Sequence, residues 1–67
     1  MRVLVNGEPA HVADGATVSE VLEPLGVSPR RGVAVAVAGE VLPRGEWDRR
    51  VLGEGERVEV VQAIQGG

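Results

Sequence analysis

The middle of the chain alternates valine with alanine over six residues, "VAVAVA" (33–38). Side chains of a β-strand point alternately to its two faces, so Val33, Val35 and Val37 share one face and the alanines share the other. A strand of this kind buries its valine side against a second layer, so the segment predicts a sheet covered on one face. Valine supplies fourteen residues of the chain, which has no Phe or Tyr, and this also favours strands.

One segment of the chain has the period of a helix. Thr17 suits the N-cap and Glu20 stands three residues later, which is the spacing of a capping box. We expect Pro24 to make the last turn irregular and Gly26 to end the helix in the left-handed region. The apolar positions repeat at helical spacing and form one stripe, consisting of Val18, Val21, Leu22 and Leu25.

Strands are predicted on both sides of this helix. Residues 2–6 and 9–13 flank the turn signal "NGEP" (6–9) and predict a hairpin, with Pro9 on an edge strand. Residues 32–44 predict a shorter hairpin, and residues 57–64 the last strand. The order of hairpin, helix, hairpin and last strand is a ββαββ arrangement, an α+β fold in which one helix covers one face of a mixed sheet. The first and last strands are the most uniformly apolar, so we expect them to pair in parallel at the centre, as in a β-grasp fold.

Length and composition disfavour several classes of function. Sixty-seven residues predict a single domain, 1–67. The chain has no cysteine and only one histidine, His11, so we expect no metal site. Its net charge of −3 disfavours nucleic acid as a partner, and no apolar run approaches the roughly 20 residues that span a membrane. Because the first residues lack a signal-peptide pattern, a cytoplasmic location is predicted.

A few conspicuous side chains predict structure rather than chemistry. The single tryptophan, Trp47, is expected to pack in the core or at its rim, as a lone Trp in a small domain usually does. Three acids near the last strand are expected to form a solvated surface: Glu54, Glu56 and Glu59. No combination of residues resembles an enzyme active site.

Four segments together resemble the ThiS family, the ubiquitin-like sulfur carrier proteins of thiamine biosynthesis. They are "VNGE" (5–8), "DGATVSEVL" (14–22), "VAVAVAGEVLPRGEW" (33–47) and "GEGERVEVVQAIQGG" (53–67). The resemblance covers the whole chain. Its most specific part is the Pro-Arg-x-x-Trp pattern at 43–47, since other ubiquitin-like carriers also end in Gly-Gly.

The resemblance implies a protein carrier that is not itself an enzyme. It implies that an adenylating enzyme of the ThiF type, similar to ubiquitin-activating enzymes, uses ATP to activate the carboxylate of Gly67. A sulfur donor such as a cysteine desulfurase would then provide the sulfur of a thiocarboxylate, and thiazole synthase would receive it. The chain is expected to bind no cofactor itself, because the activating enzyme uses the ATP.

The end of the chain suits this chemistry. Residues 63–67 are predicted to form a flexible tail, which reaches roughly 17 Å when extended at ~3.3–3.6 Å per residue. Gly66 and Gly67 follow Gln65, and we expect these three residues to thread into partner active sites. Neither glycine has the Cβ that would widen the thread and restrict its backbone.

The strand alternation also predicts a surface on which partners dock. If Val3, Val35 and Val58 face the helix, their neighbours lie on the uncovered face of the sheet, where polar residues are the norm. The apolar residues predicted there are Leu4, Ala34, Ala36 and Val61. An exposed apolar patch near the tail is a candidate docking surface.

Three other functions fit parts of the sequence. The small subunit of molybdopterin synthase shares the β-grasp fold and the Gly-Gly end, but that family is usually longer and richer in Phe. A ubiquitin-like protein modifier would use the same carboxylate to form isopeptide bonds, although this chain has no lysine on which to build chains of itself. A β-grasp interaction domain without acyl chemistry would not need the tail.

Overall fold

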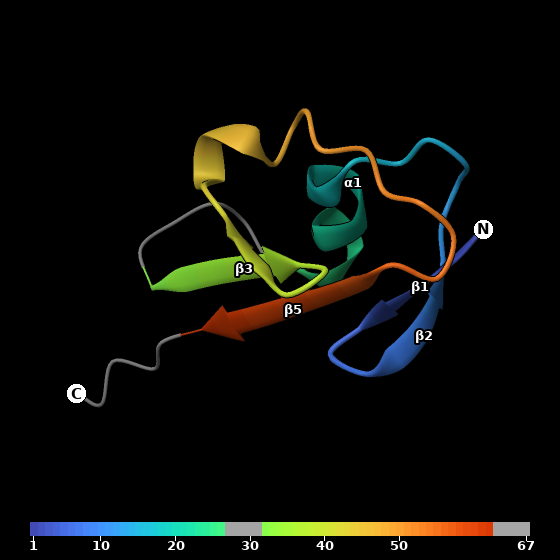
Figure 1. Ribbon diagram of the computed structural model, residues 1–67, viewed down its shortest axis with the longest axis horizontal. Coiled ribbons are helices and arrows are strands. Elements are labelled where there is room, and N and C mark those ends of the chain that lie inside the picture. Colours follow the sequence, from blue (N-terminus) through green and yellow to red (C-terminus); the bar gives the residue numbers. More distant parts are fainter. Residues whose placement is uncertain (27–31, 63–67) are drawn as a thin grey trace.

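The computed structural model describes residues 1–26 and 32–62 (Figure 1). Within them the order of hairpin, helix, hairpin and last strand is as predicted. The strands are β1 (Arg2–Val5), β2 (Glu8–His11), β3 (Val33–Val37), β4 (Glu40–Leu42) and β5 (Arg57–Gln62). The helix is α1 (Val18–Leu22), and two 3₁₀ turns follow α1 and β4, η1 (Glu23–Leu25) and η2 (Arg44–Glu46).

All five strands form one mixed sheet in the order β2-β1-β5-β3-β4. The pairing of β1 with β5 is parallel, with Val5 opposite Val58, and the other three pairings are antiparallel. The last strand in the sequence is therefore the middle strand of the sheet, between the two hairpins (Figure 1). This confirms the predicted parallel pairing and the β-grasp arrangement.

The first hairpin turns at Asn6 and Gly7. Their φ angles are 51° and 84°, so both residues lie in the left-handed region. A two-residue turn with this backbone matches the twist of the flanking strands, and Asn-Gly is the pair that adopts it most readily. The turn delivers Pro9 to β2 at the edge of the sheet, where its missing N–H costs no ladder bond, as predicted.

The backbone amides at the start of α1 find hydrogen-bond acceptors both near and far in the sequence. Thr17 is the N-cap, and both bonds of the capping box are present: the Glu20 amide donates to Thr17 Oγ1, and the Thr17 amide donates to Glu20 Oε1. The next two amides, those of Val18 and Ser19, donate to the carbonyls of Arg50 and Trp47 at 3.0 and 3.1 Å. Since these amides have no partner inside the helix, the segment between β4 and β5 holds the start of α1 in place.

One prediction about the helix is wrong. Leu25 was expected to continue the apolar stripe, but 52% of its surface is exposed. Pro24 lacks an N–H and ends the α-helical ladder, so Glu23–Leu25 form a 3₁₀ turn instead. A 3₁₀ turn advances about 120° per residue, against 100° in an α-helix, which rotates Leu25 out of the stripe. Gly26 ends the turn at a φ of 75°, as predicted.

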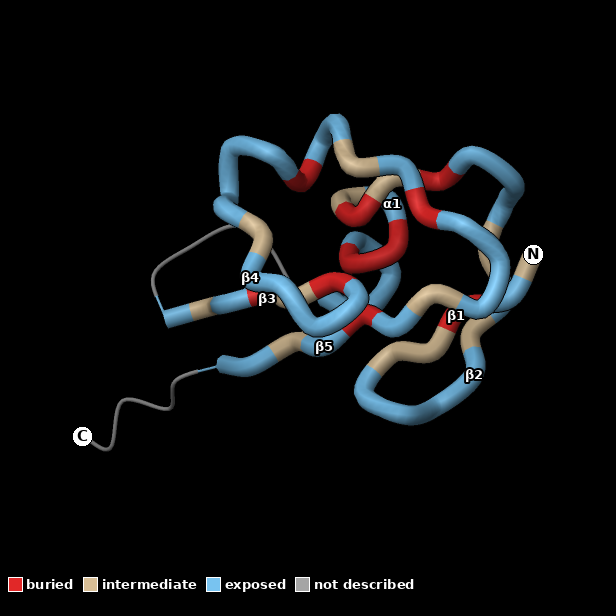
Figure 2. The backbone as a smooth tube through the Cα atoms, viewed as in Figure 1, coloured by how far each residue is buried: buried red, intermediate tan, exposed pale blue. Residues whose placement is uncertain are grey.

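The core lies between the sheet and α1, with the segment between β4 and β5 closing it from the side (Figure 2). Its buried residues are all apolar: Val3, Ala16, Val18, Val21, Leu22, Val35, Val37, Trp47, Leu52 and Val58. Full burial of one Val or Leu side chain contributes about 1.5–3 kcal/mol. The valine face of β3 points into this core, as the alternation predicts.

Trp47 packs in this core, as expected. Only 2% of its surface is exposed, and its indole Nε1–H donates to the carbonyl of Leu42 at 3.0 Å. The Pro-Arg-x-x-Trp pattern therefore forms a corner in which η2 turns the chain after β4 and returns Trp47 beneath it. The indole has both an apolar surface to bury and a partner for its N–H.

Glu56 was expected to be solvated, but its side chain is partly buried and paired with Arg50. Its carboxylate accepts a hydrogen bond from the Arg50 guanidinium at 2.6 Å and another from the Gly53 amide at 2.8 Å. These bonds and the charge of Arg50 hold the pKa of Glu56 below its ordinary value of 4.5, although partial burial acts the other way. The pair joins both ends of the loop that leads into β5.

We predict that Glu56→Gln lowers the free energy of unfolding at pH 7 by about 1 kcal/mol, because a partly exposed charged pair is lost. The folded-state pKa of Glu56 is depressed, so its contribution is complete above the unfolded-state pKa and disappears as pH falls through the folded-state pKa. The difference between wild type and variant should therefore shrink below pH 4.5. Urea unfolding at several pH values, followed by Trp47 emission, measures this difference.

Glu40→Gln is the matched control, since Glu40 lies at an exposed end of β4 and its side chain makes no hydrogen bond or ion pair with the described residues. Its effect on stability should be small at every pH. A difference for Glu56→Gln that stays constant from neutral to acidic pH would contradict the ion-pair explanation.

We also predict that Trp47→Phe lowers the free energy of unfolding by about 1–3 kcal/mol, because the Leu42 carbonyl loses its donor and the smaller ring leaves a void. Denaturant unfolding followed by far-ultraviolet circular dichroism measures the loss. Val51→Ala, at an exposed position of the same segment, should change stability by less than about 0.5 kcal/mol. Equal effects of the two variants would show that Trp47 does not support the core.

Candidate functional site

The predicted reactive end of the chain follows β5. Gln62 is the last residue of β5. Gln65, Gly66 and Gly67 lie outside the described residues, as does the rest of the predicted tail (63–67), so their roles stay predictions. The geometry that bears on the site is that of the strand leading to them.

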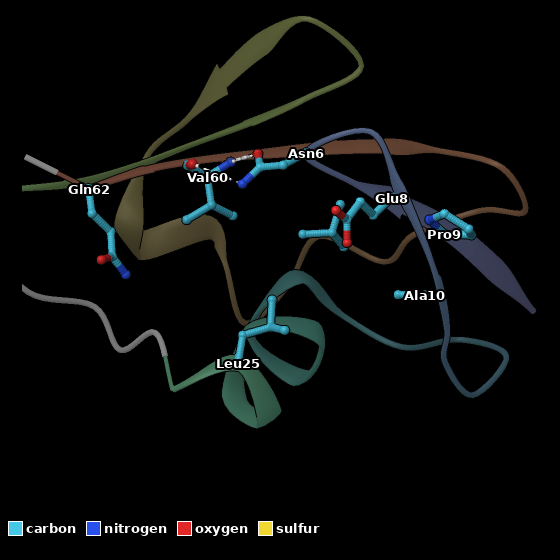
Figure 3. A pocket seen from close by; sticks show the side chains of 8 residues that line it. Asn6, Glu8, Pro9, Ala10, Leu25, Val60 and Gln62 are labelled. Carbon is cyan, nitrogen blue, oxygen red and sulfur yellow. Dashed lines mark hydrogen bonds between the residues drawn. The ribbon is translucent and has the colours of Figure 1, made fainter.

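β5 pairs with a neighbouring strand on each side, but the two pairings end at different residues of β5. On one side β3 pairs with β5 as far as Gln62, which lies opposite Val33. On the other side the backbone pairing with β1 ends with Val5 opposite Val58. Beyond it, the side chain of Asn6 reaches across to the backbone of Val60 (Figure 3).

The outer face of the sheet, away from α1, carries a mainly apolar hollow of about 270 Å³ close to the end of β5, and Asn6 and Glu59 also line it. Ala34 lies opposite Val61, and Ala36 lies opposite Val41, so strand pairing brings these side chains together. Val41 and Val61 are 77% and 64% exposed, unusually high values for valine. We call this surface the outer patch; it consists of Ala34, Ala36, Val41 and Val61.

The outer patch so defined differs from the sequence-based set at two residues. Leu4 lies opposite Arg57 and lines a neighbouring hollow, which shares Glu59 with the hollow of the outer patch, so its place in the docking surface stays a prediction. Val41 was missed, although it follows the same alternation one strand further on. Finding it required the register of β4 against β3, which a three-residue strand does not reveal in its sequence.

A further hollow, of about 570 Å³, lies on the side of the sheet that faces α1 (Figure 3). The exposed Leu25 of η1 and Gln62 at the end of β5 both border it. Its lining is mixed, and consists of Val5, Asn6, Glu8, Pro9, Ala10, Leu25, Val60 and Gln62. Among the described residues that line it, Glu8 is the only titratable one.

Residues 1–26 and 32–62 contain no group of three or more acidic or histidine side chains placed to hold a metal ion. The helix in this part of the chain is too short to cross a membrane. The predicted cytoplasmic location stays a prediction.

The mixed five-stranded sheet with a helix over one face defines the chain as a β-grasp domain. The crystal structure of the thiamine biosynthesis protein ThiS from Geobacter metallireducens superposes with a TM-score of 0.81 at 36% identity, over all of both chains. The sequence profile of the ThiS family matches residues 3–67. The chain belongs to the ThiS family, the sulfur carrier proteins of thiamine biosynthesis, and is a carrier rather than an enzyme.

Two curated relatives extend over almost the whole chain. The sulfur carrier protein ThiS of Thermus thermophilus is 45% identical over 65 residues, which are 97% of this chain and 98% of the relative. The sulfur carrier protein ThiS of Escherichia coli K12 is 33% identical over 67 residues, the full length of both. These matches favour thiamine biosynthesis over the molybdopterin and protein-modifier alternatives.

A different kind of relative is a thiazole synthase. The thiazole synthase of Magnetococcus marinus contains a segment 39% identical to this chain, over all 67 residues but only 20% of its own length. A second thiazole synthase, from Paramagnetospirillum magneticum, shows the same relation at 33% identity. In those proteins a segment of this kind and a larger part share one polypeptide.

Proposed function

We propose that this protein carries sulfur as a thiocarboxylate on Gly67, formed through adenylation of the Gly67 carboxylate. The proposal rests chiefly on membership of a sulfur carrier family with a match that extends to residue 67. The position of β5 supports it, because the middle strand of the sheet leads to the last residues of the chain.

The chemistry requires a partner at each step, since a free carboxylate is a poor electrophile. In an adenylating enzyme of the ThiF type, a carboxylate oxygen of Gly67 attacks the α-phosphorus of ATP and pyrophosphate leaves. A sulfur nucleophile from a donor such as a cysteine desulfurase then attacks the acyl carbon. AMP leaves with the electron pair of the acyl–oxygen bond, which gives an acyl disulfide with the persulfide of the donor. A thiol reductant then attacks the donor's own sulfur and forms a disulfide with it, and the thiocarboxylate of Gly67 leaves with the electron pair of the S–S bond. The carrier supplies the acyl group and a surface, and the ATP belongs to its partner.

We assign the docking of these partners to the outer patch. An enzyme that holds the terminal residues in its active site also meets the surface next to the end of β5, and the outer patch lies there. Burying exposed valine surface on docking is favourable by about 25 cal/mol per Å². Glu59, opposite Ala36 on β5, adds a negative charge at the border that a basic residue of the partner would complement.

Thiazole synthase is the acceptor that we propose for the sulfur. The two relatives that hold a related segment and a thiazole synthase in one polypeptide support this assignment. A covalent link raises the effective concentration of the two parts to about millimolar, which benefits only proteins that work together.

We predict that incubation with ATP, the adenylating enzyme and a sulfur source raises the intact mass by the difference between one sulfur and one oxygen. Mass spectrometry of the whole chain measures this change. Deletion of Gly66 and Gly67 should abolish it, because the acyl group is then lost from its place in the active site. An unchanged mass in the wild type, with the partners active on another carrier, would refute the proposed function.

For the outer patch, we predict that Val61→Glu raises the KM for the carrier in adenylation about tenfold or more, because a charge must be buried at the interface. Val51→Glu is the control, since Val51 is also a half-exposed valine but lies on the segment over α1. Leu4→Glu tests whether the docking surface reaches the neighbouring hollow. If Val61→Glu and Leu4→Glu both leave adenylation unchanged, the outer face is not the docking surface.

A further inference from the structure

Asn6 makes three hydrogen bonds to β5. Its backbone amide donates to the Val58 carbonyl at 2.9 Å, as the last bond of the β1–β5 ladder. Its side-chain Oδ1 accepts from the Val60 amide at 2.8 Å, and its Nδ2 donates to the Val60 carbonyl at 3.3 Å. The side chain thus continues the ladder by one step, at the point where the backbone of β1 has already turned away (Figure 3).

The turn and these bonds together explain the residue type. Position 6 has a φ of 51°, a conformation that Gly, Asn and Asp adopt more readily than other residues. Among these three, only Asn carries both a donor and an acceptor on its side chain. The turn alone would accept Gly, so the carboxamide of Asn6 is needed for its bonds to Val60 rather than for the hairpin.

The bonds act where the strand leaves the body of the sheet. Val60 precedes Gln62, the last residue of β5, by two positions, and Gly67 by seven. Without the Asn6 side chain, β5 beyond Val58 would pair only with β3 in the described part of the chain. A strand held on one side is freer to twist and fray than a strand held on both.

We propose that Asn6 is a positioning residue for the acyl chemistry at Gly67: its carboxamide fixes the end of β5 and so the direction in which the following residues enter a partner active site. The proposal rests on the proposed function. Its physical basis is entropy, because backbone that is already fixed before docking need not be ordered during it.

This role has a kinetic signature. Asn6 borders the hollow of the outer patch, but the Asn6 variants leave the apolar residues of that patch unchanged. KM for the carrier should therefore change little when the carboxamide bonds are lost. Placing Gly67 for attack on ATP depends on the direction of β5, so kcat should fall. A merely structural role would lower stability and leave both constants unchanged for folded protein.

The test compares Asn6→Gly, Asn6→Asp and Thr17→Ala with wild type in ATP–pyrophosphate exchange catalysed by the adenylating enzyme. Asn6→Gly keeps the turn and removes both side-chain bonds. Asn6→Asp is nearly isosteric, but it places an oxygen where Nδ2 faced the Val60 carbonyl. Thr17→Ala loses the helix cap, which costs stability without touching β5.

We expect both Asn6 variants to lower kcat by roughly five- to thirtyfold with KM nearly unchanged, the equivalent of one more backbone residue to order. Thr17→Ala should keep the wild-type kcat. Amide hydrogen exchange should quicken at Val60 in Asn6→Gly and stay unchanged at Leu52, whose amide bonds to Ala16 far from β5.

Wild-type kcat in both Asn6 variants, with faster exchange at Val60, would overturn the proposal and leave the proposed function intact. An equal loss of kcat in Thr17→Ala would also overturn it, because the effect would then follow stability. Absence of exchange activity in the wild type itself, with an enzyme that activates another carrier, would instead refute the proposed function.

Discussion

The pairing of β5 with β1 on one side and with β3 on the other holds the sheet together. Neither hairpin touches the other in the sheet, so β5 alone joins them. Val58 lies opposite Val5 on one side and Val37 on the other, and is fully buried. Because β1 and β5 are neighbours, the sheet is complete only when the first and the last strand are both in place, and β5 is bound at the centre of the fold.

The same arrangement suits the proposed role of a carrier whose partners supply the chemistry. The helix and the segment carrying Trp47 cover one face of the sheet, which leaves the other face free for partners. The outer patch lies on that free face beside the end of β5. Under the proposed function, a partner would meet this surface and the strand that leads to Gly67 next to each other, and would supply the nucleotide and sulfur chemistry itself.

What the sequence predicts well is local. The capping box needs only Thr17 and Glu20, the hairpin needs only the Asn-Gly pair, and the faces of β3 need only its alternation. The remaining features depend on residues far apart in the sequence. The carbonyls that accept from the first amides of α1 belong to Trp47 and Arg50, some 30 positions away. No sequence pattern near the helix predicts them.

Strand register and helix type decide which features of the candidate site could not be predicted from the sequence. Leu4 and Val41 have the same alternating pattern as their neighbours, but the pairing of β1 with β5 and of β4 with β3 decides which of them joins the outer patch. Leu25 does not join the apolar stripe of the helix, because Pro24 ends α1 and a 3₁₀ turn follows Leu22. The partner of Asn6 could not be predicted either, because Val60 lies 54 positions away.

A single-turnover transfer of labelled sulfur tests most directly whether this chain delivers sulfur to thiazole synthase. The protein would be converted to its thiocarboxylate with isotopically labelled sulfur, separated from the activating enzymes and mixed with thiazole synthase and its other substrates. If this chain delivers the sulfur, the label appears in the thiazole product in step with its loss from Gly67. Thiazole that forms without the label, or a label that stays on the carrier while thiazole accumulates, would contradict the claim that this chain delivers the sulfur.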